Sequence, residues 1–175
     1  MKRYILLLAT LFISTVTFAQ WSIRHIDADE LRGQEECYFN FYNSPKGDSF
    51  SFGSTQPLSF IIGTRSGIFN YGDDAFGYHT LKVIVGYYVG KELVDKATET
   101  LYISKDGNSN YAGSLGGELA NKVVNHLKTK GDVRIIAPKY SGSDYDVRIP
   151  MNKNLKVDSE IEIKETEIVV PKLNN

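Results

Sequence analysis

The chain has 175 residues, of which 42% are hydrophobic, 12% aromatic and 23% charged. This composition is that of a single folded domain, and it excludes a disordered acidic tail, a collagen-like repeat and a low-complexity linker protein. The formal net charge is −1. If Lys2 and Arg3 are removed with a leader, 18 Lys and Arg remain against 21 Asp and Glu, and the net charge becomes −3. We therefore expect no basic surface for nucleic acid or anionic lipid.

Residues 1–19 have the pattern of a secretion signal peptide. Lys2 and Arg3 form a positive start, residues 4–18 are apolar apart from Thr and Ser, and Ala19 provides a small residue at the predicted cleavage site. An apolar run of about 15 residues is shorter than the roughly 20 that span a bilayer. Gln20 rather than Cys follows the predicted cut, so we expect no acyl anchor and no stable membrane anchor once the leader is removed.

The remaining chain has few features of a eukaryotic secreted domain. Cys37 is its single cysteine, and it contains no Asn-x-Ser/Thr acceptor for glycosylation. Small exported domains that lack disulfides must obtain their stability from a hydrophobic core. The sequence thus predicts export by a Sec-type signal peptide and a periplasmic or secreted protein of bacterial type.

Residues 20–154 are predicted to form a β-rich globular domain. Alternating apolar and polar residues predict strands at 21–26, 37–42, 50–52, 58–62, 79–89, 93–104, 133–137 and 145–149. The strand at 79–89 has the strongest pattern and is expected to lie in the centre of a sheet. Residues 63–77 contain four glycines and are predicted to form a long loop that carries function.

One amphipathic helix is predicted at residues 115–129. Its apolar residues recur at helical spacing, Ser114 is the predicted N-cap, and Gly131 follows the predicted end. Many short strands with one helix predict a mainly β fold, either an antiparallel β-sandwich or a rolled sheet with the helix packed against it. Residues 155–175 combine β-branched residues with dense charge, which predicts a charged edge strand or a loosely ordered C-terminal tail.

The residues that usually carry catalysis or bind metals do not form a recognisable pattern. Cys37 alternates with Phe39 and Phe41, which favours a buried apolar thiol over a nucleophile. The three histidines have no metal-binding spacing, and no serine-hydrolase motif or nucleotide-binding loop is present. We therefore predict no catalytic residue, no metal and no cofactor, and the sequence favours a protein without enzymatic activity.

The chain is rich in tyrosine, with eleven Tyr beside nine Phe and one Trp. Tyrosine suits contact surfaces because its ring is amphipathic and loses little side-chain entropy when ordered. We predict a non-enzymatic binding module that holds a protein or glycan partner through a Tyr-rich sheet face and the 63–77 loop. The candidate ligand-binding residues are Tyr38, Tyr42, Tyr71, Tyr87 and Tyr88.

Two other functions fit the sequence. A small hydrolase would use a carboxylate pair drawn from Asp27, Asp29, Asp73 and Asp74 on either side of a cleft. An envelope assembly component would instead add residues 155–170 as a strand to the sheet of a neighbouring protein. The first function requires the acidic residues to converge, and the second requires a segment that is free to pair.

Overall fold

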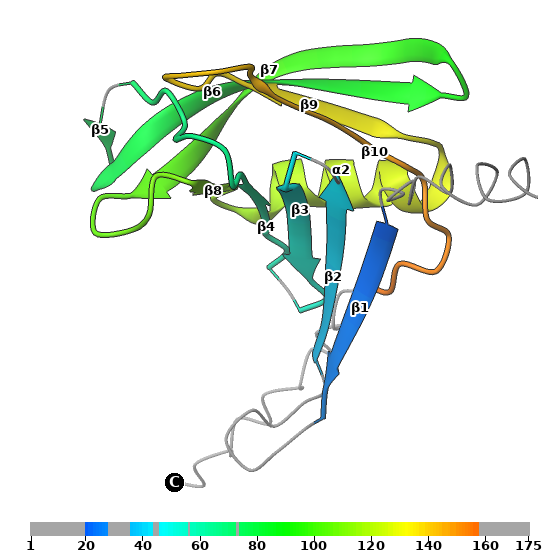
Figure 1. Cartoon of the computed structure of the whole chain (residues 1–175). Helices are drawn as coiled ribbons and strands as arrows, with labels where there is room; N and C mark the ends of the chain where they lie inside the picture. Colours follow the sequence, from blue (N-terminus) through cyan, green and yellow to red (C-terminus); the bar gives the residue numbers. More distant parts are fainter. Residues whose placement is uncertain (1–19, 28–35, 44–45, 56, 73, 158–175) are drawn as a thin grey trace, which may run out of the picture.

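The computed structural model describes residues 20–27, 36–43, 46–55, 57–72 and 74–157 (Figure 1). The predicted signal peptide therefore lies outside the described residues, as do residues 158–175 of the predicted C-terminal segment. The strands are β1 (Gln20–Ile26), β2 (Glu36–Asn43), β3 (Asp48–Gly53), β4 (Phe60–Gly63), β5 (Asp74–Ala75), β6 (Tyr78–Val89), β7 (Glu92–Ser104), β8 (Tyr111–Gly113), β9 (Val133–Ala137) and β10 (Tyr145–Ile149). The helix α2 (Gly117–Thr129) lies between β8 and β9 in the chain.

All ten strands belong to one antiparallel sheet. The strand order is β1-β2-β3-β4-β8-β7-β6-β9-β10, and β5 pairs with the start of β6. The predicted mainly β fold with a single packed helix is confirmed over the described residues. β6 lies between β7 and β9, as its sequence pattern predicts.

The sheet rolls, so that strands from opposite ends of the strand order meet. The hydroxyl of Tyr145 on β10 donates a hydrogen bond to the backbone oxygen of Ser49 on β3 at 2.9 Å. The indole Nε1 of Trp21 on β1 donates to the backbone oxygen of Pro150, just after β10, at 3.1 Å. In Figure 1, β1–β3 run at a steep angle to β6 and β7, and α2 lies beneath β9 and β10. The apolar core lies inside this roll.

The inward faces of the strands supply the core by simple alternation. On β2 and β3 the buried residues include Cys37, Phe39, Phe41, Phe50 and Phe52. Their rings pack against one another in the core. The Phe39 and Phe52 rings, for example, are stacked with centroids 4.9 Å apart. Leu155, the first residue of the predicted C-terminal segment, is also buried in the core.

The helix begins later than predicted. Leu115 is 48% exposed, and the N-cap position is held by Gly116 with a φ of 78° and no side-chain cap. Ser114 is not the cap, because its Oγ accepts a hydrogen bond from the backbone N–H of Phe60 at 3.0 Å. The predicted cap thus joins the helix entrance to β4.

The end of the helix lies very close to β6. Gly131 donates its backbone N–H to the carbonyl of His126 at 3.0 Å, which confirms its expected position after the helix. A Cβ added to Gly131 would lie 1.9 Å from the carbonyl oxygen of Tyr88, so only glycine fits. His126 on α2 bonds to the same carbonyl oxygen through Nε2 at 2.9 Å. No helix among the described residues is long and apolar enough to cross a membrane.

Candidate functional site

The alternation that builds the core also builds an outward face on β2, β3, β4 and β8. Side chains of successive strand residues point to opposite sides of the sheet. The phenylalanines of β2 and β3 point inward, so the residues between them point outward. Apart from Ile61 on β4, which is 46% exposed, these outward residues are small or polar, with tyrosines on the flanking strands: Tyr38, Asn40, Tyr42, Ser49, Ser51, Gly63 and Tyr111.

The strand register places two tyrosines at the ends of one cross-strand row. Tyr42 pairs with Ser49, Ser49 pairs with Gly63, and Gly63 pairs with Tyr111. Neighbouring strands are about 4.8 Å apart, so the row spans about 14 Å from β2 to β8. Only small residues lie between the two aromatic side chains. The result is a low floor with an aromatic wall at either end.

A cavity of about 250 Å³ lies over this row. We name it the Tyr42–Tyr111 slot after its two walls. Its lining is polar, because it includes the Asn40 amide and the hydroxyls of Ser49 and Ser51. Arg65, which follows β4, lines the same cavity.

Gly63 sets the position of the Tyr111 wall. A Cβ added to Gly63 would lie 2.7 Å from Cε1 of Tyr111 and 2.8 Å from Oγ of Ser49. The Tyr111 ring can therefore lie over the glycine, against the sheet, only because no side chain stands beneath it. The ring still remains open to solvent, since Tyr111 is 55% exposed.

A second cavity, of about 320 Å³, lies beside the first, and Tyr111 lines both. We name this cavity the Tyr78–Tyr102 slot, because these two rings line it in a T-shaped arrangement with centroids 6.2 Å apart. Tyr102 on β7 pairs with Gly113 on β8, so the slot continues the same face of the sheet. The two slots together form what we call the tyrosine groove.

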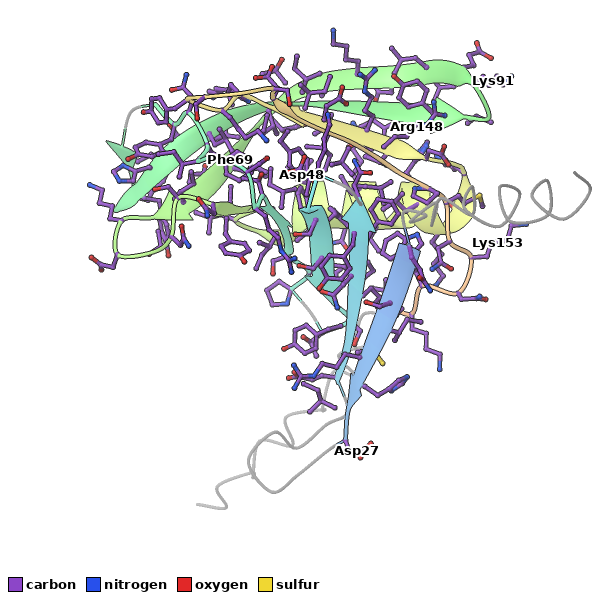
Figure 2. The ribbon with its side chains drawn as sticks, viewed as in Figure 1. Asp27, Asp48, Phe69, Lys91, Arg148 and Lys153 are labelled. Carbon is purple, nitrogen blue, oxygen red and sulfur yellow. The ribbon has the colours of Figure 1, made fainter. Side chains whose placement is uncertain are left out.

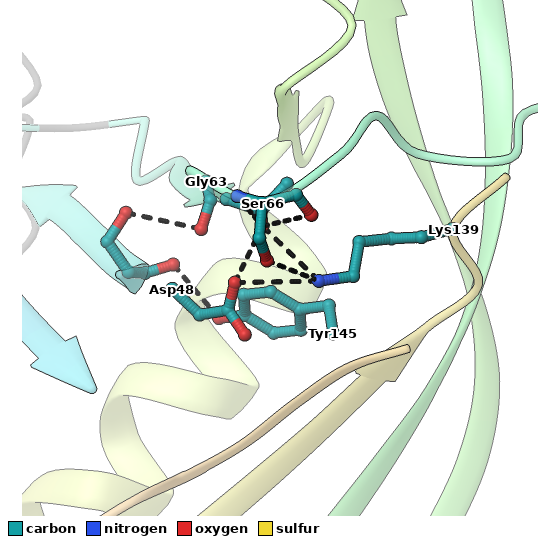
Figure 3. A network of polar contacts seen from close by, with 7 residues as sticks. Asp48, Gly63, Ser66, Lys139 and Tyr145 are labelled. Atoms are coloured by element: carbon teal, nitrogen blue, oxygen red, sulfur yellow. Dashed lines mark hydrogen bonds and ion pairs between the residues drawn. The ribbon is translucent and has the colours of Figure 1, made fainter. Parts of the chain in front are cut away.

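A buried polar network lies beneath one end of the groove (Figure 3). The side chains of Asp48 and Lys139 are almost fully buried, and Lys139 Nζ lies 3.8 Å from Asp48 Oδ1. Thr64 donates its hydroxyl to Asp48 Oδ1 at 2.6 Å, and Lys139 donates to Ser66 Oγ at 3.2 Å. Three segments that are distant in sequence are thereby joined: the start of β3, the residues after β4 and the residues after β9.

This network fixes the groove from below. Thr64 belongs both to the network and to the lining of the Tyr42–Tyr111 slot, so the ion pair holds the chain that leads into Arg65. Burial raises the pKa of Tyr145, and the nearby Asp48 carboxylate raises it further. The Tyr145 phenol thus stays protonated and can keep its hydrogen bond to Ser49 in the slot floor.

The structure places only two of the five predicted tyrosines on this face. Tyr38 and Tyr42 are exposed on the outer side of β2. Tyr71 is half-buried in the 63–77 loop and stacks on His79 with ring centroids 4.4 Å apart. The predicted set is therefore divided between different parts of the molecule.

Tyr87 and Tyr88 take part in packing at the other end of β6. Tyr87 is 2% exposed, and its ring meets the edge of His126 at a centroid distance of 5.1 Å. Tyr88 is half-buried, with the Arg148 guanidinium 4.3 Å from its ring centroid. Neither residue reaches the outward face of β2 and β3. The sequence assignment instead missed Tyr78, Tyr102 and Tyr111 as residues of a shared groove.

The buried thiol predicted for Cys37 is confirmed, with an unexpected neighbour. Cys37 is 8% exposed, and its Sγ lies 3.4 Å from Nδ1 of His25. The two residues are directly opposite in the β1–β2 ladder. Imidazole beside thiol is an arrangement that nucleophiles use, but the burial of this thiol limits the access of a substrate.

Of the acidic residues proposed for a hydrolase, the structure describes Asp27 and Asp74, which lie in different parts of the molecule. Asp27 lies just beyond β1 at the bottom of Figure 2, whereas Asp74 belongs to β5 at the upper left of Figure 1. Asp29 and Asp73 lie outside the described residues. The part of the chain that the structure describes contains no group of three or more His, Cys, Asp or Glu suited to a metal ion.

Comparison of the chain with known protein families, with curated proteins and with solved structures finds no match. The function is therefore inferred from the geometry of the tyrosine groove and from the chemistry of the residues that line it.

Proposed function

We propose that this protein is an exported, non-catalytic binding protein that holds a glycan chain in the tyrosine groove. The row Tyr42–Ser49–Gly63–Tyr111 is the observation that carries the proposal. Sugar rings present C–H faces that pack on aromatic rings, and they present hydroxyls that exchange hydrogen bonds with short polar side chains. The groove offers both kinds of contact within one cross-strand row.

The shape of the groove favours a glycan over a folded protein partner. A stable protein interface buries about 800 Å² on each partner around an apolar centre. The Tyr42–Tyr111 slot instead has a hydroxyl- and amide-bearing floor between separate rings. Its volume of about 250 Å³ suits a ring-sized unit rather than a protein surface.

The two adjoining slots favour a chain over a single sugar. Tyr111 lines both slots, and its strand β8 lies between the strands of Tyr42 and Tyr102 in the sheet. A linear oligosaccharide that crosses Tyr111 would place one unit against Tyr42 and a later unit against Tyr78 and Tyr102. Affinity should therefore rise with chain length until both slots are filled.

A glycan array probed with the purified mature protein tests this function. We expect binding to a set of linear oligosaccharides, with at least a tenfold gain from the monosaccharide to the longer chains, equivalent to about 1.4 kcal/mol. Absence of binding to every glycan on an array that covers bacterial and host structures would contradict the proposal.

Export is part of the proposed function, because the protein must leave the cytoplasm to reach a glycan in the cell envelope or outside the cell. The predicted leader at residues 1–19 supports export. Expression of the full chain in a bacterial host, followed by fractionation and N-terminal sequencing, should yield an envelope or secreted protein that begins at Gln20. A cytoplasmic protein that retains Met1 would contradict export without affecting the groove.

A further inference from the structure

We infer that the glycan unit in the Tyr42–Tyr111 slot is a uronate and that Arg65 binds its carboxylate. This inference depends on the proposed glycan-binding function. Among the described residues that line the slot, Arg65 is the single charged one, and the others carry hydroxyls, an amide, rings or no side chain. A guanidinium beside the floor binds a carboxylate through charge-assisted hydrogen bonds, which are stronger than those it donates to the hydroxyls of a neutral sugar.

The Arg65 guanidinium is available to a ligand. Arg65 is exposed, and within the described part of the chain its side chain forms no hydrogen bond or ion pair. Its stem lies against Gly47 in the β2–β3 turn, where an added Cβ would come within 3.0 Å of both Cβ and Cδ of Arg65. Gly47 also has a φ of 72°, a conformation that favours glycine. The turn thus leaves room for the arginine to lie along one end of the slot.

The buried network beneath the slot does not neutralise the charge of Arg65. Asp48 is the buried acid of the network, and it is already paired with Lys139 and accepts a hydrogen bond from Thr64. The buried pair carries no net charge as an ion pair. The described lining of the slot contains no acid that pairs with the Arg65 guanidinium, so the guanidinium can bind an incoming anion.

Charged residues of both signs surround the slot, and Lys46 lies close enough to Asp146 on β10 for its charge to help lower the pKa of that carboxyl. Arg24 on β1 lies opposite Tyr38 in the ladder, and Lys46 is exposed in the turn beside Gly47. Glu36 is the acid on this side of β2, and it accepts a hydrogen bond from the hydroxyl of Tyr38 at 2.9 Å. Of the charged residues that the structure describes, Arg65 alone lines the slot, so its guanidinium is the charge that an anionic ligand in the slot would meet.

The chemistry of arginine favours a carboxylate. The planar guanidinium presents parallel N–H donors that match the two oxygens of a carboxylate, with charge-assisted bonds stronger than those between neutral groups. The lining of the adjoining Tyr78–Tyr102 slot contains no charged residue among those described. The groove should therefore recognise a carboxylate on only one sugar of the oligosaccharide, the sugar in the Tyr42–Tyr111 slot.

Matched pairs of oligosaccharides test the inference. The array carries oligo-galacturonates, oligo-mannuronates and glucuronate-containing oligosaccharides, each beside the same chain with its carboxyl groups converted to methyl esters. We expect at least tenfold tighter binding to an acidic form than to its ester. Arg65→Gln should lower binding of the acid about tenfold and leave binding of the ester unchanged, and Arg65→Lys should fall between the two.

Lys91→Gln is the matched control, because it also removes one positive charge but lies at the turn between β6 and β7, far from the groove (Figure 2). It should change neither form of binding. Equal binding of acid and ester would overturn this inference and leave the proposed glycan binding intact. An acid preference that persists in Arg65→Gln and Arg65→Lys, or that falls equally in Lys91→Gln, would overturn the role of Arg65. Binding of neither form, with other glycans on the array still bound, would overturn the uronate inference alone, whereas absence of binding to every glycan would overturn both proposals.

Discussion

The ring of Tyr111 lies over Gly63, so close that a Cβ added to the glycine would stand 2.7 Å from Cε1 of the ring. The two residues face each other in the β4–β8 ladder. One glycine thus decides where the wall shared by both slots can stand. A larger residue at position 63 must push the ring away from the sheet.

Gly63→Ala should therefore weaken glycan binding at least tenfold while the protein remains folded. The new methyl group displaces a ring at the surface, where Tyr111 can move into solvent. Gly72→Ala is the control, because its added Cβ meets no atom nearer than 3.9 Å. Unchanged binding by Gly63→Ala, measured on the same array, would show that the Tyr111 ring position does not matter.

The buried pair of Asp48 and Lys139 should be strongly coupled. Either Asp48→Asn or Lys139→Met leaves one charge buried without its partner, and such losses cost about 3–5 kcal/mol. The double variant removes both charges and should be more stable than the sum of the single losses implies. Urea denaturation at neutral pH measures the coupling, and strictly additive losses would contradict it.

Gly131 should tolerate no side chain. The added Cβ would lie 1.9 Å from the backbone oxygen of Tyr88, and this atom cannot move without disturbing β6. We expect Gly131→Ala to lower the free energy of unfolding by about 3 kcal/mol or more, at the upper end of overpacking effects. Gly72→Ala should change it by no more than about 0.5 kcal/mol. A Gly131→Ala protein as stable as this control would refute the close approach.

The ion pair across β9 and β10 should make stability depend on acid pH. Arg134 donates two hydrogen bonds to Asp146, at 2.7 and 2.6 Å, and these bonds lower the pKa of the Asp146 carboxyl. A group whose pKa falls on folding stabilises the protein above its unfolded pKa of about 3.9, and this stability is lost as the pH falls through the folded pKa. The pair is partly exposed, so its contribution should be about 0.5–1 kcal/mol.

Asp146→Asn should accordingly be less stable than the wild-type protein at pH 7 and nearly equal to it at the lowest pH at which both fold. Chemical denaturation across this range measures the difference. A difference that stays constant with pH would mean that titration of Asp146 is not its source.

Local patterns in the sequence predicted most elements of this fold. The alternation of apolar and polar residues located β2 and β6 correctly, because each strand is long enough for the alternation to persist over most of its length. The helix start was wrong because Ser114, a good cap by residue type, bonds to Phe60 instead. That bond depends on the pairing of β4 with β8, whose residues are about fifty positions apart and carry no local signal for each other.

The candidate site was predictable only in part for the same reason. The alternation of β2 placed Tyr38 and Tyr42 outward, and the structure agrees. On β6 the same alternation put Tyr87 on the face of the buried Leu81, so its burial was implied by the pattern that was used to find the strand. Tyr111 could be assigned to the groove only once the register across β3, β4 and β8 was known.

Three tyrosine replacements, measured side by side on one glycan array, test most directly whether tyrosines of the outward face bind the ligand. Tyr42→Ala and Tyr111→Ala remove the two walls of one slot, whereas Tyr140→Ala removes a tyrosine that is as exposed as Tyr111, at 55%, but lines neither slot. We expect at least tenfold weaker binding for the first two variants and wild-type binding for the third. Equal effects of all three, or wild-type binding by Tyr42→Ala and Tyr111→Ala, would contradict the account.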